Sequence, residues 1–286
     1  MNTFSSSNHV QLALCCSLMK HGLDAKPRGL ATKELLGASF VITQPRNRLT
    51  TIPGRGWNAS LAVAELAWNL RAEQSVEPLA FYVPRWRAFA DEHGQLRGSC
   101  YGASIFQQTS QAPSQWQQVR ALLRDDPQSR RAVLSLRRER DVSAPTNDLS
   151  CTNTIQFIAR EGRLHAFVNM RSNDVIWGVP YDVFLFSTLQ ELMALELHLD
   201  LGHYHHYASS MHVYQRHFKL AKSIAESDVS KLDHGNMPAI ESVESAIRFA
   251  NMEAGIRAGK SFDCSVKTHY EKKCLELLKL SPALAA

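Results

Sequence analysis

The sequence predicts an α+β fold in which a mixed β-sheet packs against helices. Short runs rich in β-branched and aromatic residues, at 28–43, 132–136, 155–159 and 164–168, are typical of strands. Longer segments with helical apolar spacing or helix-start signals, at 58–73, at 187–202 and from about 219 onward, are typical of helices. We therefore expect a sheet covered by helices.

Length and composition indicate an ordinary folded protein. The chain has 286 residues, of which 44% are hydrophobic and 21% charged, and its 14 glycines and 11 prolines are too few for a collagen or a disordered chain. The net charge of +5 is spread without a long block of like charge. This pattern suits a small anionic ligand and argues against a nucleic-acid tail. We expect no nucleic-acid partner.

The first 27 residues predict a loose arm followed by a possible short helix. The apolar run from Val10 to Met19 is about half the ~20 residues of a membrane span. No Lys or Arg precedes it, as a signal peptide would require. We expect a cytoplasmic protein with no membrane contact, whose residues 28–286 form a single domain.

The elements follow in order along that domain. Residues 28–43 predict a strand pair, and Asn58 can cap a helix that runs to about Glu73. Residues 74–117 predict loops with short helical turns, followed by the strands near 132, 155 and 164. The capping-box pattern from Ser187 to Gln190 predicts the start of a buried helix that Gly202 ends. The tail predicts helices interrupted at Pro238 and Gly255.

Six cysteines occur without a CxxC pair, which excludes a zinc ribbon and a thioredoxin motif. Cys151 begins the longest motif in the chain. Gln156 follows five residues later, Arg171-Ser172 follows at twenty, and Gly178-x-Pro-Tyr181 comes after that. Further short segments belong to the same pattern as this motif. They lie at 64–68, 90–94, 101–102, 129–131 and 212–214.

Together these motifs resemble thymidylate synthase and its relatives, the pyrimidine nucleotide hydroxymethylases, over roughly residues 28–218. The resemblance implies the thymidylate synthase fold and a homodimer through the sheet with shared active sites. It also implies 5,10-methylenetetrahydrofolate as co-substrate and a pyrimidine nucleotide 5′-monophosphate as substrate. In such enzymes a thiolate adds to C6 of the pyrimidine, and the ring can then attack a one-carbon unit through C5.

The resemblance assigns Cys151 as that nucleophile. A cysteine taken alone is more often buried and inert, and the flanking motif favours the nucleophile. Arg171 would help to populate the thiolate. Four arginines resemble the phosphate clamp: Arg28 and Arg171 from one subunit, Arg130 and Arg131 from its partner. Arg46 and Arg48 compete with Arg28 for that assignment. The remaining nucleotide-binding residues implied are Ser172, Gln156, Asp182, His212 and Tyr214.

The same resemblance assigns Glu65 to proton transfer, and its position on an apolar helix face should raise the pKa of the carboxyl. Asp174 would face the pterin. Trp86, Trp177, Gly178 and Tyr181 would shape the folate slot, although ordinary core packing is an equal alternative for Trp86. Tyr101 belongs to one of the matching segments.

Histidines at 203, 205, 206, 212 and 217 raise the alternative of a metal site. They alternate with Tyr204, Tyr207 and Val213 as strand residues do, and no Cys or carboxylate supports them at ligand spacing. We expect no metal.

Asp182 departs from the thymidylate synthase pattern, which has Asn there to read uracil. A carboxyl group that shares a proton with N3 matches cytosine instead. Thr152, where the synthases have His, further weakens a methylating assignment. We therefore expect transfer of a hydroxymethyl group to C5 of a cytosine nucleotide, with dCMP favoured and CMP possible. The alternatives are a methylating synthase acting on dUMP or dCMP, and a non-catalytic nucleotide- or RNA-binding descendant.

Overall fold

The computed structural model describes residues 2–137, 146, 148–228, 230, 232–260 and 266–284. One eight-stranded sheet runs in the order β1-β3-β8-β6-β5-β4, with β2 beside β3 and β7 beside β8. Its strands are β1 (Asn2–Phe4), β2 (Leu23–Ala25), β3 (Thr32–Ile42), β4 (Val133–Ser135), β5 (Thr152–Arg160), β6 (Arg163–Met170), β7 (Asn173–Asp174) and β8 (Asp200–Tyr214). The pairs β1–β3, β6–β8 and β7–β8 are parallel and the others antiparallel, so the predicted mixed sheet is confirmed.

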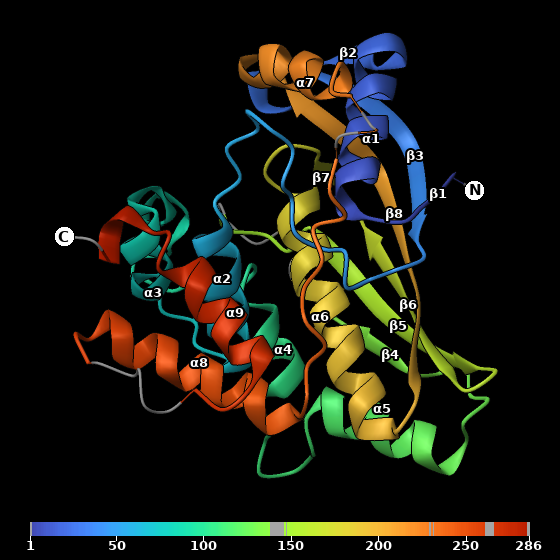
Figure 1. The fold of residues 1–286 in the computed structure, drawn as a ribbon, viewed down its shortest axis with the longest axis vertical. Helices are drawn as coiled ribbons and strands as arrows, with labels where there is room; N and C mark the ends of the chain where they lie inside the picture. Colours follow the sequence, from blue (N-terminus) through green and yellow to red (C-terminus); the bar gives the residue numbers. More distant parts are fainter. Residues whose placement is uncertain are drawn as a thin grey trace.

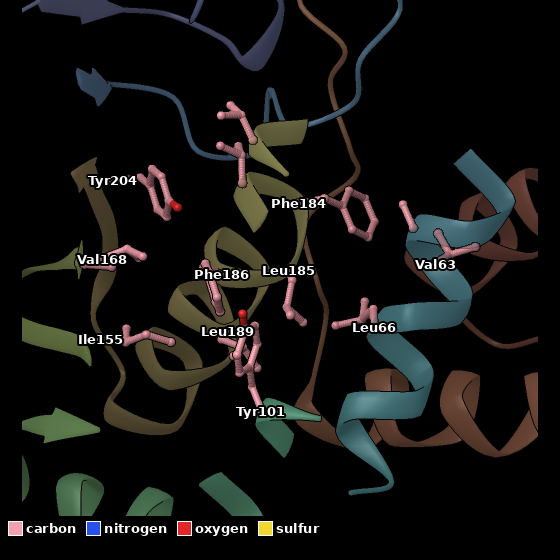
Figure 2. Packing of buried hydrophobic residues seen from close by; sticks show 14 of the residues in the cluster. Val63, Leu66, Tyr101, Ile155, Val168, Phe184, Leu185, Phe186, Leu189 and Tyr204 are labelled. Atoms are coloured by element: carbon pink, nitrogen blue, oxygen red, sulfur yellow. The ribbon is translucent and has the colours of Figure 1, made fainter. Parts of the chain in front are cut away.

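Helix α6 (Val179–Leu197) lies between the sheet and a second layer of helices (Figure 1). Figure 2 shows Phe186 and Leu189 of α6 on the side of Ile155 and Val168, while Phe184 and Leu185 lie toward helix α2. Most of α6 is buried around its whole circumference, as expected for a helix that is apolar on every face.

The second layer contains α2 (Ala59–Leu70), α8 (Val243–Arg257) and α9 (His269–Leu278), with α3 (Glu77–Tyr82) at one end (Figure 1). Asn58 caps α2 as expected, because its Oδ1 accepts a 3.0 Å hydrogen bond from the Leu61 amide. Helices α4 (Tyr101–Phe106) and α5 (Gln115–Asp125) lead into β4. None of the described helices is long and apolar enough to span a membrane.

The sheet surface opposite α6, here called the outer face, carries half-buried and exposed side chains. Strand alternation places Gln156, Ile158, His165, Phe167, His205 and Tyr207 there, whereas Ile155, Phe157 and Tyr204 point inward. Phe167 stacks on His205 with ring centroids 4.2 Å apart.

The prediction of a loose N-terminal arm was wrong, whereas the helix predicted after it is present as α1. Residues 2–4 form β1, which pairs in parallel with β3, and α1 (Ser7–His21) packs against α7 (Phe218–Ala225). Val10, Cys15 and Leu18 of α1 are fully buried. This apolar face contributes to the main core, which explains why the segment is ordered.

Two helix boundaries also differ from expectation. Helix α6 begins after Gly178, with Pro180 in its first turn, and it ends at His198 in a left-handed conformation. The Ser187 and Thr188 hydroxyls donate to the carbonyl oxygens of Val183 and Phe184 inside the helix, so the capping-box reading was wrong. Gly255 lies inside α8 and does not interrupt it. Pro238 does separate helices, since it lies between α7 and α8.

A buried ion pair ties the loop after β3 to α6. Glu191 accepts hydrogen bonds from the Arg46 and Arg48 guanidinium groups and from the Ile240 amide at 3.1 Å. The side chains of Arg48 and Glu191 are 0% and 2% exposed. Burial opposes ionisation of Glu191, but Arg48 and Arg46 outweigh it and hold the pKa of this carboxyl below its usual value.

Replacing Glu191 with Gln keeps the shape and removes the charge that compensates the buried Arg48. We expect the free energy of unfolding to fall by about 3 kcal/mol or more, because an uncompensated buried charge remains. Urea unfolding measures this loss. Glu77→Gln, which breaks the exposed pair with Arg87, is the matched control and should leave the midpoint unchanged. Equal urea midpoints for Glu191→Gln and Glu77→Gln would contradict the conclusion that Glu191 compensates the buried charge of Arg48.

Candidate active site

Cys151 lies immediately before β5 and is held beside Arg171, which follows β6. The Arg171 amide donates to the Cys151 carbonyl at 2.9 Å, and Arg171 Nη2 lies 3.6 Å from Cys151 Sγ. Arg171 Nε and Nη2 also donate to the carbonyls of Ser150 and Leu149, at 2.9 and 3.2 Å. These bonds fix the guanidinium against the thiol.

The thiol of Cys151 is mostly protonated in this environment. Burial raises the pKa of Cys151, Arg171 opposes the rise, and Asp182 and Asp148 add to it. Arg28 also acts on the thiol and favours the thiolate, although its own side chain is exposed. The balance of burial and arginine charge therefore sets the nucleophilicity of Cys151.

Two carboxyl groups from different helices belong to this region: Asp182 acts on the Cys151 thiol, and Glu65 acts on Asp182. Asp182 lies in the first turn of α6, where burial and the neighbouring charge of Glu65 raise its pKa well above the usual value. Burial raises the pKa of Glu65, on α2, to about 7. Tyr101 is within electrostatic reach of Asp182, Cys151 and Glu65, and burial raises its pKa far above 10.0.

Ser172, His212 and Tyr214 lie together where β7 pairs with β8. Ser172 Oγ lies 3.5 Å from His212 Nδ1, and the rings of His212 and Tyr214 meet edge to face with centroids 5.1 Å apart. The Arg216 guanidinium covers the Tyr214 ring at 4.4 Å. These neighbours restrain all three polar side chains.

The residues expected at the folate slot have different neighbours in the structure. Asp174 Oδ1 accepts from the amides of Ile176 and Trp177, at 2.7 and 3.3 Å, and so shapes the loop that enters α6. Trp177 is 44% exposed and lies against His217 with ring centroids 4.7 Å apart. Tyr181 packs against Trp57, whereas Trp86 packs against Phe89.

Gly178 is required by close packing in this loop. A Cβ on Gly178 would lie 1.9 Å from Asn173 Oδ1 and 2.8 Å from the Asp174 carbonyl oxygen. No side chain fits there without moving the loop.

Three predicted nucleotide ligands are not brought to Cys151 within one chain. Arg130 and Arg131 are exposed beside the start of β4. Gln156 donates to the Arg130 carbonyl at 2.7 Å and lies on the outer face, because strand alternation turns it away from α6. The competitors of Arg28 are engaged elsewhere, since Arg46 and Arg48 pair with Glu191.

Sequence reasoning missed several side chains near the predicted site. Arg85 and Arg216 each lie 5.1 Å from the Trp177 ring centre. Trp57 Nε1 is buried and lacks a hydrogen-bond partner among the described residues. Cation–aromatic pairs between distant segments carry no local sequence signal, so only the fold could bring them together.

Three histidines also converge on the outer face. One ligand atom from each of His165, His203 and His205 lies within 4.8 Å of the others. The His203 amide donates to His165 Nδ1 at 3.1 Å, which leaves the proton of the neutral ring on Nε2. A metal ion that binds a nitrogen of His165 would have to displace either the His203 amide hydrogen or the hydrogen of the ring itself. The three histidines therefore fit a metal ion poorly.

Removing Arg171 should make the Cys151 thiol less reactive. Arg171→Met deletes the nearest positive charge, so the pKa of the thiol rises further and alkylation by iodoacetamide near pH 8 slows severalfold. Peptide mass spectrometry follows Cys151 separately from the other cysteines. Arg163→Met, at the far end of β6, is the control and should leave the rate unchanged. A rate independent of Arg171 would show that this guanidinium does not tune the thiol.

Comparison with known proteins identifies the family of this chain. The thymidylate synthase family matches residues 10–250, a longer stretch than the motifs alone indicated. The deoxyuridylate hydroxymethyltransferase of Bacillus phage SP01 is 29% identical over 259 residues, which cover 85% of this chain and 67% of that protein. The deoxycytidylate 5-hydroxymethyltransferase of Enterobacteria phage T4 is 28% identical over 240 residues, covering 79% and 94%.

More distant relatives agree as well. The thymidylate synthase of Buchnera aphidicola subsp. Baizongia pistaciae is 28% identical over 218 residues, covering 74% of this chain and 81% of that protein. The structure of thermostable thymidylate synthase A from Bacillus subtilis superposes with a TM-score of 0.65 at 21% identity, covering 77% of this chain and 84% of that one, and shares the fold. The chain therefore belongs to the thymidylate synthase family, whose members transfer one-carbon groups to pyrimidine nucleotides.

Proposed function

We propose that the protein transfers a hydroxymethyl group from 5,10-methylenetetrahydrofolate to C5 of a cytosine nucleotide 5′-monophosphate, with dCMP favoured and CMP possible. The observation that carries the choice of base is Asp182. Burial and Glu65 raise the pKa of its carboxyl well above the usual value, which favours the neutral acid, and the carboxyl is within electrostatic reach of Cys151. A neutral carboxyl can donate to cytosine N3 and accept from the N4 amino group.

Cys151 would attack C6 as a thiolate. Arg171, 3.6 Å from the sulfur, stabilises the negative charge that forms before attack. The new C6–S bond moves electron density to C5, and this carbon then forms the bond to the one-carbon unit. The C5 proton would leave to a base, and the bond between the one-carbon unit and the folate nitrogen would break, which releases tetrahydrofolate and leaves a methylene group on C5. Water would lose a proton and add to this methylene as the hydroxyl group, the C6–S bond would break, and the thiolate would return.

Glu65 is the best candidate for the proton transfers. With a pKa of about 7 it is available as both acid and base near neutral pH. In the hydroxymethylation reaction it would activate the water that supplies the hydroxyl group. The charges of Asp182, Cys151 and Glu65 also act on Tyr101. Its raised pKa would keep the hydroxyl protonated, so that it can donate a hydrogen bond.

The proposed nucleotide contacts follow the described geometry. Ser172 and Arg171 adjoin Cys151 in the loop after β6 and can meet the phosphate, with His212 and Tyr214 at the sugar. Arg130 and Arg131 are exposed and unattached to this site, which supports their contribution from a second subunit. The half-buried aromatic outer face supports a sheet-to-sheet dimer.

The folate side of the site fits the proposed co-substrate. Trp177 and Tyr181 offer flat rings, Arg85 and Arg216 offer charge for carboxylates, and the buried Trp57 N–H offers an unused donor. Asp174 and Gly178 fix the conformation of the loop that enters α6. Trp86 lies in the neighbouring 3-10 turn (Pro84–Phe89). The folate, when bound, supplies a one-carbon unit at the oxidation level of formaldehyde.

A methylating enzyme acting on dUMP or dCMP is the second candidate within the family. The choice depends on whether water or hydride completes the transfer, and Thr152 in place of His favours water. A nucleotide- or RNA-binding descendant without activity is disfavoured, because Cys151, Glu65 and Arg171 are assembled together. The deciding experiment incubates dCMP, CMP and dUMP with methylenetetrahydrofolate and identifies each product by mass spectrometry. The expected product is a 5-hydroxymethyl cytidylate.

Asp182→Asn should move the base preference from cytosine toward uracil. The amide has nearly the same shape but offers a fixed NH₂ donor for uracil O4 and cannot share a proton with cytosine N3. The measurement is kcat/KM on cytidylate and the matching uridylate for both proteins. A wild type that prefers uridylate, or a variant whose preference does not move, rules out Asp182 as the base reader.

Shared active sites predict complementation between two inactive variants. Arg131→Ala and Cys151→Ala damage different halves of the proposed composite site. A heterodimer can then assemble one site free of both changes, so mixed subunits should recover up to about a quarter of the activity. Turnover after verified subunit exchange is the measurement, with each variant alone as control. A monomer in solution, or no recovery, excludes the shared site.

A further inference from the structure

The water step of the proposed reaction needs a group that holds the water. Once tetrahydrofolate has left, the methylene group on C5 reacts with the nucleophile that reaches it, and C5 is bonded to C6, the carbon that carries Cys151. A water molecule stays at one place in a protein interior when it has roughly two to four polar partners. Glu65 is proposed above as the base, so a further polar group beside Cys151 has to bind the same water.

Thr152, the residue after Cys151, carries a buried hydroxyl that the protein itself leaves unused. Thr152 is 0% exposed, and its Oγ1 has no hydrogen-bond partner in the part of the chain that the structure describes. The buried hydroxyls of Ser187 and Thr188 differ, since each donates to a carbonyl oxygen of its own helix. The large majority of buried polar side-chain atoms in proteins have a partner, so this hydroxyl indicates a bound water or substrate group.

The strand register turns Thr152 toward the side of the sheet on which α6 lies. Thr152 is paired with Met170 across β5 and β6, so the two side chains share one face. Met170 is 1% exposed and follows Val168 by two residues on β6, and Val168 faces α6 (Figure 2). A bulge between Thr152 and Thr154 shifts the register, so Thr152 and Ile155 both face inward although they are three residues apart.

The backbone holds this hydroxyl beside the nucleophile. The Cys151 carbonyl accepts from the Arg171 amide at 2.9 Å, and the Thr152 carbonyl accepts from Ser150 Oγ at 2.6 Å. Threonine is branched at Cβ, which restricts its first side-chain torsion. The position of Oγ1 relative to the Cys151 sulfur therefore varies little.

Thr152 also belongs to the cluster that contains Glu65. Burial raises the pKa of Tyr101 far above its usual value, and the nearby Cys151 and Glu65 add to the rise. The Thr152 hydroxyl acts against this rise. All three groups thus lie within interaction distance of one phenol, in agreement with the position that the strand register gives Thr152.

We propose that Thr152 Oγ1 holds the water that adds to the methylene group on C5. The inference rests on the proposed function and names the group that makes water the nucleophile. The water hydrogen that stays in the product is donated to Thr152 Oγ1, and the other passes to the Glu65 carboxylate as the new C–O bond forms. The electron pair of the exocyclic double bond moves into the ring. It then restores the C5–C6 double bond as the Cys151 sulfur leaves as a thiolate.

Thr152→Val tests this role, because it keeps the shape of the side chain and removes the hydroxyl. The assay contains cytidylate, methylenetetrahydrofolate and excess 2-mercaptoethanol, whose thiol competes with water for the methylene and leaves a thioether there. Mass spectrometry measures the ratio of thioether to 5-hydroxymethyl product. We expect this ratio to rise about tenfold in Thr152→Val, because only the water route loses a hydrogen-bond partner.

Two matched variants make the test specific. Thr152→Ser keeps a hydroxyl on the same Cβ and should stay within about twofold of the wild-type ratio. Thr154→Val removes a hydroxyl from the half-buried neighbour of the inward-facing Ile155, on the other face of β5, and should leave the ratio unchanged. Alkylation of Cys151 by iodoacetamide should proceed at the same rate in Thr152→Val as in the wild type, which separates the effect from thiol reactivity.

The outcomes separate this inference from the proposed function. A merely structural role for Thr152 lowers both products together and leaves their ratio unchanged, which would overturn the inference. A serine variant that behaves like the valine variant would overturn it too. So would a lower urea midpoint for Thr152→Val, since it would show that the hydroxyl is bonded within the protein. A wild type that forms no 5-hydroxymethyl cytidylate would instead overturn the proposed function itself.

Discussion

The burial of α6 on all sides is the constraint on which the rest of the structure depends. The sheet covers one side of this helix and α2 covers another, so most of the helix is buried (Figure 1). Asp182 lies in its half-buried first turn. Burial raises the pKa of a carboxyl group unless a cation compensates it, and among the described residues no arginine or lysine acts on Asp182 as Arg46 and Arg48 act on Glu191.

The same helix thus carries two carboxyls whose pKa values are shifted in opposite directions. Arg46 and Arg48 lower the pKa of Glu191, which lies near its C-terminal end. The hydrogen bonds of Glu191 hold the backbone at Ile240 and the loop after β3 in place. The pKa of Asp182, near its N-terminal end, is instead raised by burial and by Glu65. The difference lies in the neighbours that the fold supplies and not in the helix itself. One serves stability and the other serves the proposed chemistry.

The site is assembled where several layers meet. Cys151 and Arg171 come from adjacent strand ends, Glu65 from α2, and His212 and Tyr214 from β8. The pKa values of Cys151, Glu65 and Asp182 are all raised, and Asp182 adds to the rise at Cys151 as Glu65 adds to the rise at Asp182. Since burial dominates all three shifts, core packing and chemistry are coupled in this protein.

The amino-acid sequence by itself determined the fold class, the family and most of the strands and helices, because spacing around Cys151 and strand alternation are local patterns. It misplaced the start of α6, since the hydroxyls of Ser187 and Thr188 can bond inside a helix as readily as at its end. It also missed the packed N-terminal segment, whose partners are distant. Only the tertiary structure turned Gln156 to the outer face, and only it brought Asp182 of α6 within electrostatic reach of Glu65 and Cys151. Such contacts join residues from separate helices, strands and loops, and no local pattern contains them.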